Sequence, residues 1–330
     1  MDNRTIISRR MSSQGLSGGR FTDVASLVGW MGCVQAQDFA MAKWGVGLRS
    51  GISEAGIDAA FNAGTILRTH VLRPTWHFVL PCDIGWMLRL SAPRIRAFSK
   101  PYHRQLEIDA AVLRRSRKVI SKALQDGAFM TRVEIASMLK KAKIDTRDIR
   151  MNFLLMDAEL EGLICSGPRR GKQFTYTLMS SRVVEALGFS GDAALGELAR
   201  RFFLSHGPAT VYDLAWWGGM TLTDARRGLE VVKGALEREG VLYWGAGADA
   251  SAMPAVLLLP AFDELTVAYK DRSAILPKEY EKVSSYGLKP VIVVNGRIVG
   301  IWRRGKAVEL QFFEKASKTV MRAIEREARR

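Results

Sequence analysis

The chain of 330 residues is long enough for two or more hydrophobic cores, and its 48% hydrophobic and 25% charged residues are typical of a globular protein. Lysine and arginine number 49 against 33 aspartate and glutamate residues, and the resulting net charge of +16 predicts a polyanionic partner. The sequence shows no apolar run of membrane-spanning length and no signal-peptide core, so we expect a cytoplasmic protein without a membrane partner.

Cysteine and histidine usage bounds the redox and metal chemistry. The three cysteines, Cys33, Cys82 and Cys165, lie far apart and form no CxxC pair, and the four histidines show no ligand spacing. A disulfide framework and a zinc site are therefore not expected. We expect a reduced protein with no metal and no cofactor.

The N-terminal region predicts a helix over residues 4–11, a glycine- and serine-rich turn, and a second helical segment over 21–33. The string Gln35-Ala-Gln37-Asp38 follows and brings three polar side chains close together. On a helix, positions i and i+2 point about 200° apart, whereas in an extended or turning segment they share a face. Spacing alone favours an ordinary polar helix end over a catalytic site.

Residues 71–80 alternate apolar and polar side chains. This period of two predicts a strand with Arg73, Thr75 and His77 in a row on one face, and Pro74 would confine the strand to a sheet edge. An arginine and a histidine beside a tryptophan could hold a phosphate or a base. A half-exposed edge strand without a ligand explains the pattern equally well.

Positive charge is concentrated in three places. The stretch from Arg89 to Lys122 contains ten basic and only two acidic residues, and smaller basic clusters lie at 169–172 and 303–306. Any one cluster can be an ordinary solvated surface. Three of them on so basic a chain favour contact with phosphate groups.

The middle of the chain repeats itself. Thr131 and Thr210 each stand where a helix N-cap belongs, with Glu134 and Asp213 three positions later. Two short helices are expected after each threonine.

A glycine is expected to end the second helix of each repeat, Gly162 in the first and Gly240 in the second. Residues 163–178 then predict a strand, a turn and a strand, and residues 241–245 begin in the same way. The turn carries three basic side chains: Arg169, Arg170 and Lys172. Helices followed by a basic β-hairpin form the winged-helix arrangement, in which one helix lies in a DNA groove and the wing touches the backbone. A repeat of helical pairs without DNA binding is the alternative, and the charged wing disfavours it.

The C-terminal part changes character at Met253-Pro254. It predicts a buried strand over 254–260, a hairpin over 291–302 with Asn295-Gly296 at its turn, a strand over 307–313 and a basic helix over 314–329. A small β-barrel or sheet fits this pattern.

Charged and aromatic residues around this region have simple explanations. Asp263 and Glu264 could serve acid–base chemistry, but salt bridges to nearby lysines and arginines are favoured. Trp216 and Trp217 are expected to pack in the core.

Several strings resemble a known family in the same order along nearly the whole chain. They are Gln35-Ala-Gln37-Asp38, Leu67-Arg-Thr-His70 with Leu72-Arg-Pro-Thr-Trp-His77, Gly207-Pro-Ala-Thr210, and Tyr269-Lys-Asp-Arg272 with Gly300-Ile-Trp-Arg303. Together they resemble the AlkZ/YcaQ-type winged-helix DNA glycosylases, bacterial enzymes associated with bulky guanine alkylation and interstrand crosslinks.

The resemblance implies an α+β, mostly helical fold with three tandem winged-helix units and a small C-terminal β-barrel, in a C-shape around DNA. The expected boundaries are 1–105 for a divergent first unit with the catalytic motif, 106–182 for the second, 190–250 for the third, and 251–330 for the barrel and last helix.

The family's Gln-apolar-Gln motif falls on Gln35 and Gln37. The resemblance implies a monofunctional hydrolytic glycosylase, monomeric and nucleoid-associated, that acts on double-stranded DNA with alkylated guanine. N7-alkylation makes guanine cationic, so the base leaves readily, and two amides can orient a water and support an oxocarbenium-like transition state. A neutral base such as adenine would be a poor substrate.

Further residues become candidate DNA or lesion contacts: Arg73, Thr75, His77, Arg169, Arg170, Lys172, Lys270, Arg272 and Arg303. A non-enzymatic winged-helix regulator or architectural protein is the first alternative, and an RNA-binding protein or nuclease is the second. The sequence assigns no role to Asp38.

Overall fold

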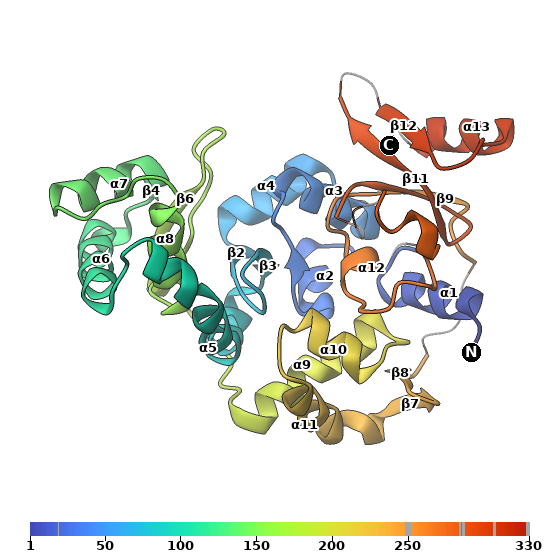
Figure 1. The fold of residues 1–330 in the computed structure, drawn as a ribbon, viewed down its shortest axis with the longest axis horizontal. Coiled ribbons are helices and arrows are strands. Elements are labelled where there is room, and N and C mark those ends of the chain that lie inside the picture. The colour runs from blue at the N-terminus through green and yellow to red at the C-terminus, as the bar shows by residue number, and fades with distance from the viewer. Residues whose placement is uncertain (19, 248–251, 284, 286–287, 306–307, 328–330) are drawn as a thin grey trace. The chain divides into compact units, whose positions relative to one another are not determined.

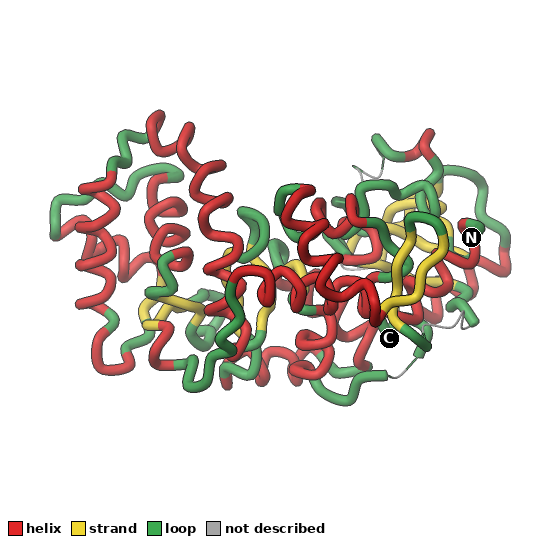
Figure 2. Tube along the Cα trace, turned by 90° about the horizontal axis from the view of Figure 1, so that it is seen from below, coloured by secondary structure: helices red, strands yellow, loops and turns green. Residues whose placement is uncertain are grey.

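The computed structural model describes residues 1–18, 20–247, 252–283, 285, 288–305 and 308–327 (Figure 1). The chain divides into two compact units: unit 1 holds residues 1–57 and 195–330, and unit 2 holds residues 58–194. Helices contain about half of the residues and the strands are short (Figure 2), so the α+β class is as expected.

Unit 1 begins with the elements that carry the glutamine string. They are α1 (Asn3–Ser13), α2 (Val24–Met31), β1 (Val34–Gln35), α3 (Phe39–Ser50) and the start of α4 (Glu54–Ala63). Aspartates accept main-chain N–H bonds at the starts of α1, α2 and α3, which satisfies donors that a helix leaves unpaired. The two helices predicted in this region are confirmed.

A second group of unit 1 elements holds the second repeat. They are α9 (Gly191–His206), which starts in unit 2, α10 (Val211–Trp217), α11 (Leu222–Val232), a 3₁₀ turn (Lys233–Ala235), β7 (Leu236–Glu239) and β8 (Leu242–Gly245). The expected helix end at Gly240 is wrong, because Gly240 lies in the β7–β8 turn with φ of +60°. Helix α11 ends at Val232, where two β-branched residues and Gly234 disfavour helix.

The C-terminal part of unit 1 is an antiparallel sheet with the strand order β12-β11-β10-β9. Its elements are β9 (Val256–Leu259), α12 (Glu264–Val267), a 3₁₀ turn (Lys278–Tyr280), β10 (Val291–Val294), β11 (Arg297–Arg304), β12 (Val308–Phe312) and α13 (Lys318–Glu327). The hairpin turn at Asn295 (φ +48°) and Gly296 (φ +81°) is confirmed.

The expected closed barrel is not what the described part of the chain forms. The sheet ends at β9 on one side and β12 on the other, and four short strands are too few to close around a core. The last helix starts at Lys318 rather than at residue 314, and the predicted ends at 307 and 328–329 lie outside the described residues.

Alternate residues of these strands build a core on each face of the sheet. One face packs against α1 and α12, through Ile7, Met11, Leu257, Leu259, Leu265, Val291 and Val293. The other face packs against α3 and α13, through Trp44, Val256, Leu258, Ile292, Trp302 and Ile324. The sheet therefore anchors α3, which follows the glutamine string in the sequence, and α12, whose Glu264 side chain contacts Gln35.

Unit 2 contains the end of α4 and the first repeat. Its elements are β2 (Leu67–His70), β3 (Trp76–Val79), α5 (Pro81–Gln105), α6 (Ala110–Ala123), a 3₁₀ turn (Gln125–Gly127), β4 (Met130–Thr131), α7 (Arg132–Lys141), α8 (Arg150–Leu160), β5 (Ile164–Ser166), β6 (Thr175–Leu178) and a second 3₁₀ turn (Met179–Ser181).

The two repeats share caps and strand connections. Thr131 and Thr210 both form capping boxes, with Glu134 and Asp213, as predicted. In the first repeat β4 pairs with β6, the second strand of the hairpin, and in the second repeat Ala209 makes the corresponding bridge to β8. In both repeats, the residue just before the capping threonine, Met130 or Ala209, therefore pairs with the second strand of the hairpin.

The strand predicted over residues 71–80 is wrong in its first half. Strands β2 and β3 form an antiparallel hairpin, and residues 71–75 are the turn between them. Leu72 has a φ of +61°, and the Thr75 N–H bonds to the Arg73 carbonyl within the turn. Arg73, Thr75 and His77 are therefore not aligned on one strand face.

Candidate active site

The two glutamines of the string differ in exposure. Gln35 ends β1 and is only 7% exposed, whereas Gln37 is exposed. The main-chain N–H of Gln37 donates to Oε1 of Gln35 over 2.9 Å, which closes a tight turn around the buried Ala36. The turn leaves the Gln37 side chain at the surface, and the buried Gln35 side-chain amide holds the main chain of Gln37 from the protein interior.

Asp38, whose role the sequence left open, is the N-cap of α3. Its carboxylate accepts the N–H groups of Ala40 and Met41, both at 3.1 Å. A cap of this kind stabilises a helix by about 1 kcal/mol. Asp38 therefore fixes the start of α3 immediately after Gln37.

Glu264, the first residue of α12, contacts the main chain of Gln35 and is 2% exposed. Its Oε1 accepts the main-chain N–H of Gln35 at 2.7 Å, and its Oε2 accepts the indole N–H of Trp217 at 3.1 Å. Nε2 of His206 lies 3.5 Å from the same Oε2. This buried carboxylate thus joins β1 to α9, α10 and α12.

The neighbouring Asp263 has a different partner. Both of its oxygens accept bonds from the Arg49 guanidinium, at 2.8 and 2.9 Å, and both side chains are buried. Burial lowers the pKa of Arg49, but the adjacent Asp263 carboxylate outweighs this and the pKa is raised overall. The favoured salt bridge is confirmed for Asp263, although its partner is Arg49 rather than the nearby Lys270 or Arg272.

His206 is fully buried and stacks on Phe202, with ring centroids 5.1 Å apart. Its Nδ1 lies 2.7 Å from the Ser205 hydroxyl oxygen. Burial lowers the pKa of His206 despite the nearby Glu264 carboxylate, so the ring is neutral at neutral pH. The contacts of His206 with Glu264 and Trp217 join separate segments of the sequence, so they could be found only in the folded chain.

Lys270 and Arg272 lie beside two exposed aromatic rings of α10. The Lys270 ammonium is 5.6 Å from the Tyr212 ring centroid, and the Arg272 guanidinium carbon is 5.7 Å from that of Trp216. Trp217 packs in the core as expected, but Trp216 is 45% exposed. Each cation therefore sits next to a ring at the surface of unit 1.

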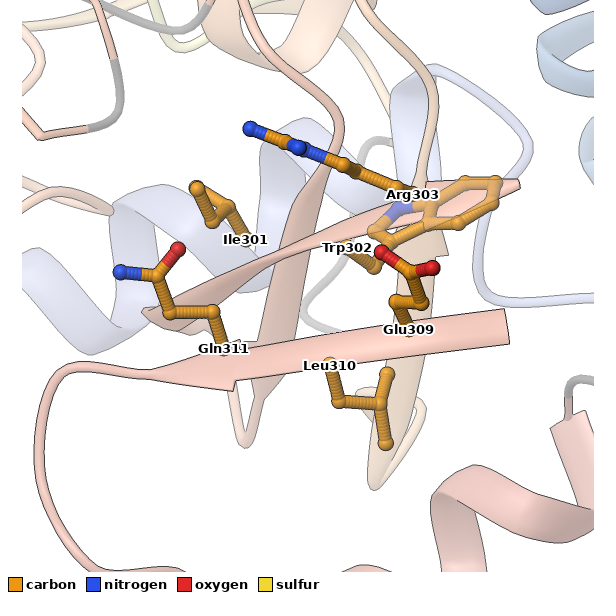
Figure 3. A pocket seen from close by; sticks show the side chains of 6 residues that line it. All are labelled: Ile301, Trp302, Arg303, Glu309, Leu310 and Gln311. Atoms are coloured by element: carbon orange, nitrogen blue, oxygen red, sulfur yellow. The ribbon is translucent and has the colours of Figure 1, made fainter. Parts of the chain in front are cut away.

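Arg303 lies on β11 and is exposed. It stands opposite Glu309 of β12, and both line a small open cavity of about 170 Å³ (Figure 3). The neighbouring Lys306 of the predicted basic cluster lies outside the described residues.

The candidates in unit 2 form two groups. Arg73 and Thr75 are in the β2–β3 turn, and His77 is fully buried with its Nδ1 2.9 Å from the Thr75 carbonyl oxygen. The β5–β6 turn holds the other group: Arg169, Arg170 and Lys172. Arg170 pairs with Glu134 at 2.7 Å, whereas Lys172 is exposed at the tip. The basic wing is thus confirmed as a hairpin turn.

Three further features of the described ranges concern metal ligands, cysteines and membrane-spanning helices. No three histidine, cysteine, aspartate or glutamate side chains there are grouped to hold a metal ion, and Cys33, Cys82 and Cys165 form no disulfide bond. None of the helices described there is both long enough and apolar enough to cross a membrane.

Two helical repeats with hairpins, a basic wing and a large positive charge are the features of a DNA-binding protein, here with an exposed amide supported by buried polar groups. The family model for AlkZ-like DNA glycosylases matches residues 28–330, and the chain belongs to this family. The match covers both glutamines and confirms the resemblance found in the sequence.

Known relatives agree with this membership. The chain is 24% identical to a Streptomyces sahachiroi protein described as an interstrand DNA cross-link repair glycosylase, over 98% of this chain and 94% of the relative. The solved structure of Streptomyces sahachiroi DNA glycosylase AlkZ matches with a TM-score of 0.81 at 21% identity, over 98% of this chain and 94% of that one. At this identity the structural match shows a shared fold.

Proposed function

We propose that the protein is a monofunctional DNA glycosylase that hydrolyses the N-glycosidic bond of cationic N7-alkylguanine in double-stranded DNA. The observation that carries the proposal is the Gln35–Gln37 turn, which presents one exposed amide supported by a buried one in a chain of the AlkZ-like family. Gln35 and Gln37 are the proposed catalytic residues.

The chemistry of the substrate suits this pair. Alkylation at N7 gives guanine a positive charge, and cleavage of the bond between C1′ and N9 returns the bonding electrons to the base and neutralises it. A water then adds to C1′ and loses a proton. Amides are weak bases, but they can hold this water in line with C1′ and stabilise the developing positive charge on the sugar.

The element order supports three winged-helix units within the proposed boundaries. Helices α2, α3 and α4 precede the β2–β3 hairpin, α6, α7 and α8 precede β5–β6, and α9, α10 and α11 precede β7–β8. The β5–β6 wing would contact the DNA backbone through Arg169, Arg170 and Lys172. Lys270, Arg272 and Arg303 of unit 1 are further proposed phosphate contacts, and the net charge of +16 supports such contacts.

The β2–β3 turn is a proposed contact near the lesion. Arg73 and Thr75 would approach the DNA, and the buried His77 would support them through the Thr75 carbonyl. A monomer without an obligate protein partner, associated with the nucleoid, suits this function.

Crosslinked guanine is a further proposed substrate. Most glycosylases extrude their target base, which a guanine tethered to the opposite strand cannot do freely. A relative described as an interstrand DNA cross-link repair glycosylase supports crosslinked guanine as a substrate. Because of the tether, we propose that the protein acts on this lesion within the duplex.

Product analysis tests the proposal. Wild-type protein is incubated with a duplex that carries one N7-methylguanine, and the expected products are free N7-methylguanine and an alkali-labile abasic site. Gln35→Ala and Gln37→Ala should bind the duplex but release little base. Unchanged release in both variants would contradict the assignment, whereas a footprint on undamaged DNA without release would favour a regulator, and direct strand scission a nuclease.

A further inference from the structure

The position of Gln37 depends on a short series of hydrogen bonds. The Gln37 main chain is held by Oε1 of Gln35 at 2.9 Å, and the Gln35 main chain is held by Oε1 of Glu264 at 2.7 Å. Strand β1 has only two residues, so few main-chain bonds of its own hold this segment in place. The Glu264 carboxylate is therefore a main support of the turn that presents Gln37.

The carboxylate itself is held rigidly. Trp217 donates to its second oxygen at 3.1 Å. The main chain of Glu264 begins α12, which Asp263 caps through the Leu265 N–H at 2.9 Å, and Asp263 is clamped in turn by Arg49. A buried carboxylate is costly to desolvate, and here one of its two oxygens holds the segment before Gln37.

We infer that Glu264 is a positioning residue for base release, which acts by holding the main chain of Gln35 so that the glutamine pair keeps its geometry. This inference rests on the proposed glycosylase activity. It assigns the effect of Glu264 to the reach of its oxygen atoms, and not to its negative charge acting on the cationic transition state.

Two substitutions separate reach from charge. Glu264→Gln keeps the length of the side chain and an oxygen for the Gln35 N–H, but removes the charge. Glu264→Asp keeps the charge and shortens the side chain by one methylene group, which withdraws the oxygen from Gln35. Asp83→Asn is the matched control, because Asp83 is another buried carboxylate that accepts a tryptophan N–H, from Trp86 at 2.9 Å.

The measurements are the single-turnover rate of N7-methylguanine release at saturating enzyme, the Kd for the same duplex, and the folded fraction by circular dichroism. We expect Glu264→Asp to lower the rate by about 100-fold, since a displacement of about 1 Å at a reacting group can cost that much. Glu264→Gln should retain more activity than Glu264→Asp, and Asp83→Asn should match wild type. The Kd of each folded variant should stay within about twofold, because Glu264 is buried.

Three results would overturn the inference: a Glu264→Asp rate within about threefold of wild type, a rate loss no larger than the loss of folded protein, or a Glu264→Gln variant slower than Glu264→Asp. The last result would indicate an electrostatic role instead. If wild-type protein releases no base, the proposed function fails, and this outcome is distinct from the other three.

Discussion

The buried Arg49–Asp263 pair gives the sharpest prediction about stability. Asp263→Asn leaves the Arg49 charge without its anion in a site where the two side chains are 2% and 1% exposed. The two hydrogen bonds of 2.8 and 2.9 Å would weaken, and breaking a buried pair in this way costs about 3–5 kcal/mol. At about 2–4 °C per kcal/mol for a unit of this size, the Tm should fall by roughly 6–20 °C.

Urea and thermal denaturation followed by circular dichroism measure this loss. The double variant Arg49→Met, Asp263→Asn should recover at least about 1 kcal/mol relative to Asp263→Asn, because no unpaired charge remains buried. A loss below about 1 kcal/mol in the single variant, or a double variant whose loss equals the sum of the single losses, would refute the reasoning.

Three further predictions concern packing, pH and DNA binding. In Gly228→Ala the new Cβ would lie 2.6 Å from the Leu195 carbonyl oxygen and push α11 away from α9, so the free energy of unfolding should fall by about 1–3 kcal/mol. Gly234→Ala is the control, because a Cβ there meets nothing within 4 Å. Equal effects of the two substitutions in urea denaturation would contradict this prediction. Burial lowers the pKa of His206 below 6.5, so the unfolded chain binds a proton that the folded chain does not. Stability should therefore decline as the pH falls below about 6.5, by up to about 1.4 kcal/mol per pH unit for this group, and urea titrations of His206→Gln should show a shallower decline than wild type. Lys172→Gln at the exposed wing tip should reduce the slope of log Kd against log salt concentration by about 1, and an unchanged slope would remove Lys172 from the DNA interface.

Local signals in the sequence predicted local structure well. The capping boxes at Thr131 and Thr210 need only residues three positions apart, and the Asn295-Gly296 turn needs only two residues that tolerate positive φ. The basic wing at 169–172 was likewise readable, because its strands and turn are contiguous.

Two local patterns in the sequence predicted the wrong secondary structure. The alternation over 71–80 implied one strand, but Leu72 adopts a positive φ and a turn interrupts the pattern. The match between Gly162 and Gly240 set the wrong register for the second repeat, since Gly162 follows a helix while Gly240 joins two strands.

The support of the candidate site could not be predicted because it is not local. Glu264 reaches the Gln35 main chain across 229 positions, and Asp263 reaches Arg49 across 214. The only sequence signal was a pair of acidic residues after a buried strand, which is compatible with many arrangements. Family resemblance located the glutamines, but only the fold reveals what holds them.

The central claim is that the Gln35–Gln37 turn is the site of base release. The most direct test compares wild type with Gln37→Ala on one N7-methylguanine duplex, with single-turnover rate and Kd measured on the same preparations. Loss of one preorganised group at a transition state lowers a rate by about 100-fold to 1,000-fold, so we predict a fall of that size with Kd changed by less than about threefold. A Gln37→Ala variant that releases the base at the wild-type rate would contradict the claim.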